Sequence, residues 1–556
     1  MSTVIAPAPV LSLQRLAEIA LDRGAGESVQ LFGEQRWLMS ELMGRARRLS
    51  SGLRDLGLQP GDRAIVCMAN CPEVGITYQA IWRAGAVVVP VLFLLSEPEL
   101  RHTVEDSAAK VIVTTADMLP KVHSATAGLP VQAIVVADSL AKKAADAIAE
   151  VTAGAGATAG AGATAGAEAA GAETGATRLV RFADLEASPE GSLVDRDPAD
   201  MAALLYTGGT TGRAKGVMLS HTALSHSAWS AVNSYYRPDV NRSIVTLPLA
   251  HVFGLLVSVM WLHSPDPTLT VLLPWFDART WLQLAEKHRV QSGAVVPAML
   301  RLLLTQPLEE YDLSALERLA SGSAPLPAET VAEFNRRLPH VEVTQGYGCT
   351  ESAGITTYSP RGRARPESVG MPVAGVEARV TRPDGSEADV GEYGELCFRG
   401  PNIMIGYWKS PEETANTLRD GWLHTGDVGY RDEEGYLFIV DRMKDVIIRN
   451  GFNVYPRDVE EAMLQHPDIA ACAVTGRPDP LNGEEVVAFV QLVPGSKATA
   501  EDLIAYAREV ISRAKYPREV RIVNQLPLTS IGKTDRKALR RILAEEAEKA
   551  KETEKA

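Results

Sequence analysis

Short apolar runs alternate with amphipathic stretches of helical length along this chain, and that alternation restricts the fold more than any other feature. The runs predict strands near residues 62–68, 87–91 and 111–114, with a helix from about Pro72 to Ala84. The same pattern resumes over Asp200–Tyr358. Strands that alternate with helices of this length form a largely parallel sheet with helices on its faces, so the predicted class is α/β.

The 556 residues exceed what one hydrophobic core organises, so two or more domains are expected. Residues 375–398 predict a β-rich subdomain with turns at Pro383-Asp384-Gly385 and Gly391. A charged segment from Asp441 to Lys444 follows a strand and marks the boundary to a small α+β domain. We therefore predict a large domain over residues 1–441, a linker at 442–443, a small domain over 444–543 and a charged, solvated helical tail over 544–556.

The stretch from Ala153 to Thr177 is a near-repeat of A-G-A-G-A-T without a large apolar residue. Such a composition buries too little surface to offset the entropy of ordering. We predict a flexible surface insertion without chemistry.

Charge and cysteine content narrow the function. A net charge of −13 argues against nucleic acid or an anionic membrane as partner. Five scattered cysteines are too few for a disulfide framework or a zinc site. The N-terminus lacks a signal-peptide pattern, and the most apolar run, Ala84–Leu95, is broken by Pro90 and is shorter than the roughly 20 residues of a membrane span. A cytoplasmic location without a membrane span is expected.

The stretch from Leu204 to His221 reads L-L-Y-T-G-G-T-T-G-R-A-K-G-V-M-L-S-H. Glycines and threonines between two apolar runs suit phosphate binding, because the backbone N–H groups can turn inward while hydroxyls and Lys215 add donors and charge. Arg213 and Ala214 separate Gly212 from Lys215, so the spacing is not that of a Walker A box. Ser220 is a candidate N-cap of the following helix. The alternative is an ordinary Gly/Thr turn between strands.

A second stretch, Gln345–Glu351, combines glycines, an aromatic ring, a hydroxyl and a carboxylate within seven residues. A purine needs a flat apolar face, and Mg²⁺ needs a carboxylate. The alternative is a strand-to-helix turn in which Glu351 favours the helix dipole. Asp427, in W-L-H-T-G-D, is placed to take two ribose hydroxyls, although such an Asp is equally a turn residue. A lone lysine, Lys533, stands in P-L-T-S-I-G-K near the C-terminus; alone, it is a solvated side chain.

Together, in this order and spacing, these stretches resemble the adenylate-forming superfamily, which includes acyl-CoA synthetases, non-ribosomal adenylation domains and firefly luciferase. The resemblance covers the chain except Ala153–Thr177 and the tail. Y-T-G-G-T-T-G and G-F-N-V-Y-P look most like fatty acyl-CoA synthetases, whereas S-G-S-A-P-L and Q-G-Y-G-x-T-E are also similar to aryl-acid ligases and luciferase.

The resemblance implies an ATP site. Its β- and γ-phosphate residues are Thr207, Gly208, Gly209, Thr210, Thr211, Gly212 and Lys215. The adenine would be stacked on Tyr347 and lined by Ser323, Ala324, Pro325, Gly346 and Gly348. Thr350 would touch the α-phosphate, Glu351 would bind Mg²⁺, and Asp427 with Arg442 would hold the ribose.

The resemblance also implies a moving small domain. Lys444 matches its hinge, Lys533 the catalytic lysine of adenylation, and Gly451 the glycine that lines the coenzyme A tunnel. The resemblance implies four catalytic residues, which are Thr350, Glu351, Lys533 and His251. It also implies that His251, together with Phe253, gates the coenzyme A tunnel. The acyl pocket would be lined by Trp229, Phe253, Leu256, Val296, Gly322 and Gly346.

The expected reaction is ATP-dependent activation of a carboxylic acid as acyl-AMP, followed by transfer to coenzyme A. An uncharged pocket with two glycines favours a medium- to long-chain fatty acid, and an aryl or alicyclic acid is the main alternative. An acyl-AMP ligase that loads a carrier protein and an inactive nucleotide-binding regulator are the other readings. The expected partners are small molecules, a homodimer being compatible, together with a lysine acetyltransferase and deacetylase acting on Lys533.

Overall fold

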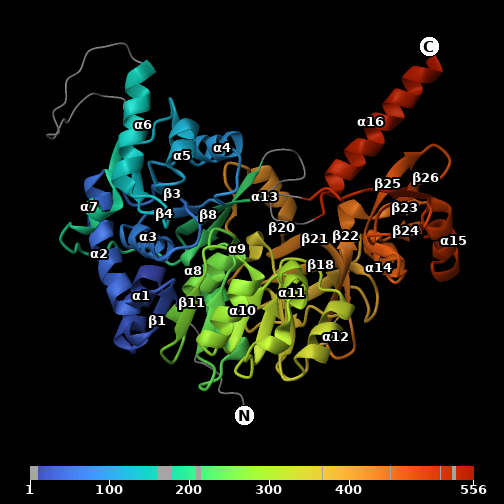
Figure 1. Cartoon of the computed structure of the whole chain (residues 1–556), viewed down its shortest axis with the longest axis horizontal. Coiled ribbons are helices and arrows are strands. Elements are labelled where there is room, and N and C mark those ends of the chain that lie inside the picture. Colours follow the sequence, from blue (N-terminus) through green and yellow to red (C-terminus); the bar gives the residue numbers. More distant parts are fainter. Residues whose placement is uncertain are drawn as a thin grey trace. The chain divides into compact units, whose positions relative to one another are not determined.

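The computed structural model describes residues 10–158, 177–207, 214–365, 367–450, 452–513, 515–528 and 534–555. The chain divides into two compact units. Unit 1 contains Met1–Ala378 and Phe398–Leu423, and unit 2 contains Arg379–Cys397 and His424–Ala556. Both units contain β-strands and helices (Figure 1).

An eight-stranded sheet in unit 1 has the order β19-β9-β8-β4-β3-β5-β6-β7. Its strands are β3 (Arg63–Cys67), β4 (Val87–Pro90), β5 (Val111–Thr115), β6 (Ala133–Ala137), β7 (Arg178–Arg181), β8 (Met201–Thr207), β9 (Lys215–Ser220) and β19 (Gly406–Tyr407). Strands β3 to β8 pair in parallel, while β9 and β19 add antiparallel strands at one edge. Strands β5 and β6 are buried along their whole length, as a parallel sheet covered on both faces requires.

A nine-stranded sheet completes unit 1, in the order β16-β15-β14-β13-β12-β10-β11-β1-β2. Its strands are β1 (Val29–Phe32), β2 (Gln35–Leu38), β10 (Arg242–Val245), β11 (Leu269–Leu272), β12 (Ser292–Val295), β13 (Arg318–Ser321), β14 (Glu342–Tyr347), β15 (Thr357–Tyr358) and β16 (Met371–Pro372). The pairing is parallel from β1 to β14 and antiparallel at both ends. Trp281 and Phe334 are fully buried in the core beside this sheet.

Helices cover both sheets of unit 1. They are α1 (Leu13–Asp22), α2 (Met39–Asp55), α3 (Pro72–Arg83), α4 (Glu97–Ser107), α5 (Leu119–Thr126), α6 (Ala144–Thr158), α7 (Phe182–Glu186), α8 (His221–Tyr235), α9 (Val252–Val259), α10 (Ala278–Lys287), α11 (Pro297–Leu304), α12 (Ala328–Arg337) and α13 (Pro411–Thr417), with 3₁₀ turns η1 (Ala25–Glu27), η2 (Met260–Leu262), η3 (Leu308–Glu310) and η4 (Thr350–Ser352). Helix α2 packs against α3 and α7, in the blue to teal part of Figure 1. Helix α3 ties the two sheets together, because Tyr78 donates to Leu249 O beyond β10 and Trp82 donates to Ala202 O in β8.

Unit 2 carries most of a five-stranded sheet of β17 (Glu377–Thr381), β18 (Gly394–Arg399), β20 (Leu418–Arg419), β21 (Trp422–Arg431) and β22 (Leu437–Arg442). Its second sheet contains β23 (Ile447–Arg449), β24 (Phe452–Val454), β25 (Ile469–Asp479), β26 (Gly483–Leu492) and β27 (Glu519–Ile522). The helices are η5 (Met443–Asp445), α14 (Pro456–Leu464), α15 (Ala500–Val510) and α16 (Arg536–Lys555). The predicted solvated tail continues α16, and Leu543 just before it is buried.

The predicted α/β class is confirmed, as is the cap at Ser220, whose Oγ accepts a hydrogen bond from Ala223 N. The predicted start of the flexible insertion is wrong, because residues 153–158 continue helix α6. Alanine has the highest helix propensity, so an Ala-rich stretch extends a helix that precedes it. The rest of the insertion, residues 159–176, lies outside the described residues, and Thr177 already donates to Val131 O beside β7.

The predicted domain boundary after residue 441 differs from the division into compact units. Val428 and Val440 pack with Tyr455 in one apolar cluster, and Asp441 Oδ2 accepts a hydrogen bond from Arg457 N. These contacts join β21 and β22 to the elements that follow them in the chain. The hinge at Lys444 stays a prediction.

No helix within the described residues has the length and apolar character to cross a membrane.

Candidate active site

The predicted phosphate-binding stretch runs from β8 into β9, two strands that pair antiparallel. Thr207, the last residue of β8, lies directly opposite Lys215, the first residue of β9. Lys215 Nζ lies 2.8 Å from Glu413 Oε1 in α13 and 5.7 Å from the ring centre of Tyr407. Strand β9 therefore presents a cation whose charge is matched by a half-exposed carboxylate. The other predicted phosphate residues, Gly208, Gly209, Thr210, Thr211 and Gly212, lie outside the described residues.

Three neighbouring parallel strands of the nine-stranded sheet bring three predicted pocket residues to one level, where β12 and β13 end and β14 runs on to Tyr347. Val295 in β12, Ser321 in β13 and Gln345 in β14 are neighbours in register, so Val296, Gly322 and Gly346 follow at one edge. A Cβ at Gly322 would lie 3.3 Å from both Gly346 O and Phe253 Cε1. The fold thus brings together four of the six residues predicted to line the acyl pocket.

The remaining predicted pocket residues come from helices α8 and α9. Trp229 is buried in α8, where its ring centre lies 5.4 Å from that of His226. Leu256 is buried in α9, and its side chain reaches Gly354. Burial lowers the pKa of His226 to about 4, so this imidazole is neutral at physiological pH. The expectation that the acyl pocket holds no charged partner for a second carboxylate stays a prediction.

His251 is the N-cap of α9, and its Nδ1 accepts a hydrogen bond from Phe253 N. This bond places His251 at the N-terminal end of the helix that carries Phe253 and Leu256. The geometry keeps the predicted gate pair together, and its role in gating stays a prediction.

The loop after β13 carries Ser323, Ala324 and Pro325. Ser323 has φ +69°, a left-handed conformation that non-glycine residues rarely adopt. Backbone strain of this kind costs about 1–3 kcal/mol and is concentrated at functional sites. The strained serine directly follows Gly322 of the acyl pocket and is consistent with the predicted approach of a flat base.

The Gln345–Glu351 stretch leaves β14 and enters η4. Tyr347 lies opposite Thr357 in β15, and its ring centre is 5.8 Å from that of Phe398. Thr350 and Glu351 open the 3₁₀ turn, and Glu351 O accepts a hydrogen bond from Met404 N. The stretch therefore forms the strand-to-helix turn that was the alternative interpretation of the sequence. The same turn carries the residues predicted to contact adenine, the α-phosphate and Mg²⁺.

Tyr407 connects this loop to strand β9, which carries Lys215. Its hydroxyl donates to Glu351 Oε1 over 2.8 Å, while its strand β19 pairs with β9 at Val217. Burial and the neighbouring carboxylate raise the pKa of Tyr407, so the phenol keeps its proton and donates. Sequence reasoning missed Tyr407 and Glu413, because both act through partners far away in the chain; the only sequence signal was the aromatic pair after Gly406.

In unit 2, Asp427 and Arg442 lie directly opposite each other on β21 and β22. Arg442 Nε is 2.8 Å from Asp427 Oδ1, and Asp427 is 4% exposed. The two predicted ribose residues are thus paired by the register of one hairpin. Lys444 follows in η5, where burial and Arg442 lower its pKa. Gly451 and Lys533 lie outside the described residues.

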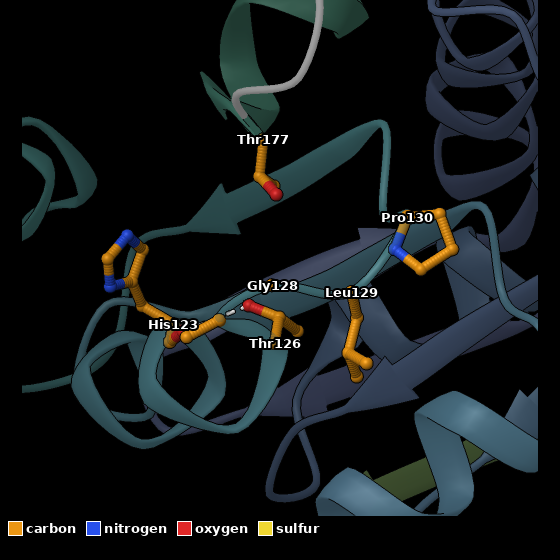
Figure 2. A pocket seen from close by; sticks show the side chains of 7 residues that line it. His123, Thr126, Gly128, Leu129, Pro130 and Thr177 are labelled. Atoms are coloured by element: carbon orange, nitrogen blue, oxygen red, sulfur yellow. Dashed lines mark hydrogen bonds between the residues drawn. The ribbon is translucent and has the colours of Figure 1, made fainter.

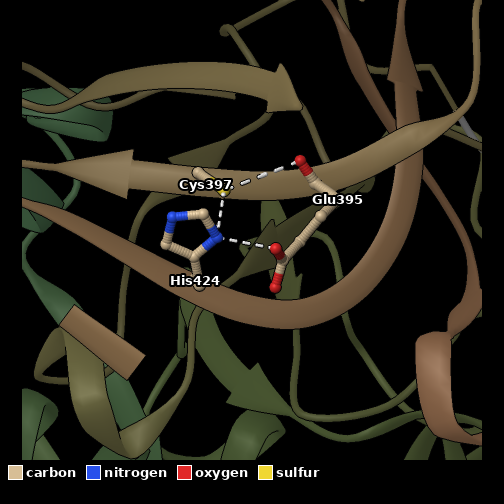
Figure 3. Close-up of side chains that lie close together, drawn as sticks. All are labelled: Glu395, Cys397 and His424. Carbon is tan, nitrogen blue, oxygen red and sulfur yellow. Dashed lines mark hydrogen bonds and ion pairs between the residues drawn. The ribbon is translucent and has the colours of Figure 1, made fainter. Parts of the chain in front are cut away.

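Two other features lie apart from the predicted residues. An open pocket of about 480 Å³ is lined by His123, Thr126, Ala127, Gly128, Leu129, Pro130 and Thr177 (Figure 2), none of which is a predicted site residue. Glu395, Cys397 and His424 place one potential metal ligand each within 4.8 Å of one another in unit 2 (Figure 3).

A substitution at Gly348 provides a direct test of the geometry of this loop. A Cβ there would lie 2.5 Å from both Gly354 C and Gly354 O, so Gly348→Ala must move backbone that carries Tyr347 and Glu351. A displacement of about 1 Å costs on the order of 10²-fold in rate, and we expect acyl-AMP formation to fall by that factor. Gly75→Ala, in α3 with no atom within 4 Å of the new Cβ, is the matched control and should keep full activity. Normal pyrophosphate exchange by Gly348→Ala would contradict the tight packing of this loop.

The fold and the grouping of these residues define an adenylate-forming enzyme. The family model for "AMP-binding enzyme" matches residues 18–408, and that for "AMP-binding enzyme C-terminal domain" matches residues 458–533. The chain belongs to the AMP-binding enzyme family, which confirms the resemblance seen in the sequence.

Individual relatives indicate more specific activities within this family. The chain is 35% identical to a long-chain-fatty-acid–CoA ligase of Bacillus subtilis strain 168, over 98% of this chain and 96% of that protein. It is also 35% identical to a feruloyl-CoA synthase of an Amycolatopsis species, over 90% of this chain and 93% of that protein. The crystal structure of ATP-bound MatB from Rhodopseudomonas palustris matches with a TM-score of 0.82 and 28% identity, covering 96% of this chain and 99% of that one.

Proposed function

We propose that this protein is an ATP-dependent acid–CoA ligase that activates a medium- to long-chain fatty acid. The observation that carries the proposal is the grouping in unit 1. In the acyl pocket that we assign, Gly322 lies against Phe253 and Gly346. Gly346 also precedes Thr350 and Glu351 in the same stretch, and Tyr407 ties Glu351 to the strand of Lys215. An acid in that pocket would lie beside groups suited to hold a nucleotide.

The first half-reaction is attack of the substrate carboxylate on the α-phosphorus of ATP, with formation of an O–P bond and departure of pyrophosphate. Positioning and charge neutralisation supply most of the acceleration in such a step. Lys215 is assigned to the departing phosphates, Thr350 and Lys533 to the α-phosphate, and Tyr347 to the adenine. ATP must then displace Glu413 from Lys215 as it binds.

Glu351 fits a Mg²⁺ site. Its Oε1 accepts the Tyr407 hydrogen bond, and within the described residues Oε2 has no hydrogen-bond partner. A carboxylate oxygen is the ligand type that Mg²⁺ takes, usually together with substrate phosphates. When bound, the ion would offset phosphate charge, while Tyr407 and the backbone bond to Met404 orient the carboxylate.

The second half-reaction is attack of the coenzyme A thiol on the acyl carbon, with release of AMP. We assign Gly451, His251 and Phe253 to the thiol tunnel. We assign Lys444 to a hinge that exchanges Lys533 for Gly451 between the two halves. We further propose that acetylation of Lys533 silences the first half, since it removes the lysine charge. A cytoplasmic location suits the five free cysteines.

A fatty acid is favoured because the residues that we assign to the pocket are uncharged, His226 beside Trp229 being neutral, and because one relative at 35% identity is a long-chain-fatty-acid–CoA ligase. An aryl acid is the second candidate, favoured by the similar identity to a feruloyl-CoA synthase.

A panel of acids tests both. Each methylene buried in an apolar channel contributes about 0.8 kcal/mol, so kcat/KM should rise about fourfold per methylene and then level off. The measurement is AMP release with and without coenzyme A. Higher efficiency with ferulate or benzoate than with every fatty acid would favour the aryl candidate. Acyl-AMP that forms but is not transferred to free coenzyme A would indicate a carrier-protein acceptor.

A further inference from the structure

Residues 424–427 of β21, which include Asp427, are attached to β18 by side chains as well as by strand pairing. Glu395 Oε1 accepts a hydrogen bond from Gly426 N over 2.9 Å, and Glu395 Oε2 accepts one from His424 Nδ1 over 2.6 Å. One carboxylate thus holds the residues on either side of Thr425. Figure 3 shows its contact with His424.

Thr425 completes the attachment. Its hydroxyl donates to Leu396 O over 2.7 Å and accepts a hydrogen bond from Asp427 N over 3.1 Å. Gly426 has φ +69°, a left-handed conformation inside strand β21. Asp427 therefore receives its backbone position from β18, and Arg442 orients its carboxylate.

The cluster is a hydrogen-bonded support rather than a metal seat. Cys397 Sγ accepts from Thr381 and lies 3.3 Å from His424 Nδ1, while its thiol points to Glu395 O. Burial raises the pKa of Cys397, which keeps the thiol protonated. The His424 and Glu395 side chains are only 8% and 12% exposed. Every potential ligand already has a partner within the cluster.

We propose that Glu395 is a positioning residue for ribose recognition, acting through Gly426 to place Asp427. The inference rests on the proposed ribose role of Asp427 and adds a residue that does not itself touch substrate. A carboxylate suits this task, since a charged acceptor makes a stronger hydrogen bond to a backbone N–H than a neutral one does.

Glu395→Ala tests the proposal, with Glu395→Gln as the conservative variant and Glu392→Ala as the matched control. Gln keeps an oxygen for Gly426 N and an amide for His424. Glu392 belongs to the same subdomain, but its side chain pairs with Arg382 and not with residues 424–427. Each variant is assayed for pyrophosphate exchange with ATP and with 2′,3′-dideoxy-ATP, which lacks both ribose hydroxyls, and each is checked by thermal melting.

Loss of a hydrogen bond to a charged group corresponds to about tenfold or more, so Glu395→Ala should raise the KM for ATP about tenfold. Its KM for the dideoxy nucleotide should stay within about twofold, and Glu395→Gln should recover most of the ATP affinity. Glu392→Ala should match the wild type with both nucleotides.

Equal losses with both nucleotides, or no loss with either, would overturn the positioning role. Asp427→Asn separates this from failure of the proposed function. If Asp427→Asn abolishes discrimination between the nucleotides and Glu395→Ala does not, the ribose site stands and Glu395 has no part in it. If neither variant alters discrimination, both assignments fall, and absence of exchange in the wild type would overturn the ligase itself. If Glu395→Ala does not fold, Glu395→Asp replaces it, because the shorter side chain withdraws the carboxylate from Gly426 N; unchanged KM values of this variant with both nucleotides would overturn the positioning role.

Discussion

Lys533→Ala is expected to lower acyl-AMP formation by about 10²–10³-fold, because it removes a cation from the place where negative charge develops. The same variant, supplied with synthetic acyl-AMP, should still form the thioester with coenzyme A at nearly the wild-type rate. The measurements are pyrophosphate exchange for the first half and thioester formation for the second.

Three further variants accompany Lys533→Ala. Lys537→Ala removes an exposed lysine from the first turn of α16 and should leave both halves unchanged. Gly451→Trp should do the opposite of Lys533→Ala, blocking transfer while acyl-AMP accumulates. Equal loss of both halves in Lys533→Ala would contradict the separate use of the two faces of the small domain. Lys533→Gln serves as the mimic of acetylation and should behave like the alanine variant.

Glu351→Gln is expected to reduce acyl-AMP formation about 10²-fold at ordinary Mg²⁺ concentration, since a neutral amide is a poorer ligand for a hard cation. The substitution keeps an oxygen for Tyr407, so it removes charge and leaves the local hydrogen bond. Part of the lost rate should return at high Mg²⁺. The measurement is the rate as a function of Mg²⁺ concentration.

Tyr407→Phe is the companion variant. It removes the hydroxyl that orients Glu351 and keeps the ring beside Lys215, so the Mg²⁺ requirement should rise only about threefold. A Glu351→Gln enzyme with an unchanged Mg²⁺ requirement would exclude Glu351 as a metal ligand.

Local signals predicted those parts of the fold and site that depend on neighbours in the chain. The apolar runs placed β3, β4 and β5 to within a residue or two, and the hydroxyl of Ser220 marked the start of α8. The motif residues Thr207 and Lys215 followed from composition and spacing, and the structure sets them opposite each other.

Sequence reasoning failed where the partner is distant. Tyr407 meets Glu351 across more than fifty residues, and Glu395 meets Gly426 across about thirty, so no local pattern marks either contact. Helix α6 extends past residue 153 because a helix already begun propagates into alanine at little cost, which a composition rule does not consider. Residues 424–441 group with the C-terminal elements because of apolar packing around Tyr455. The sequence-based boundary was placed instead on the charged residues 441–444, which carry no information about that packing.

The register of β12, β13 and β14 has a consequence for how this enzyme changes over evolution. Each strand contributes one pocket position, at Val296, Gly322 and Gly346, and its register with the neighbouring strands fixes the backbone there. A Cβ at Gly322 would lie 3.3 Å from both Gly346 O and Phe253 Cε1, so a larger side chain there would press on the neighbouring strand and on α9. Under the assignment of the acyl pocket that we propose, a single substitution at Gly322 would therefore alter acid preference through β14 and α9 together.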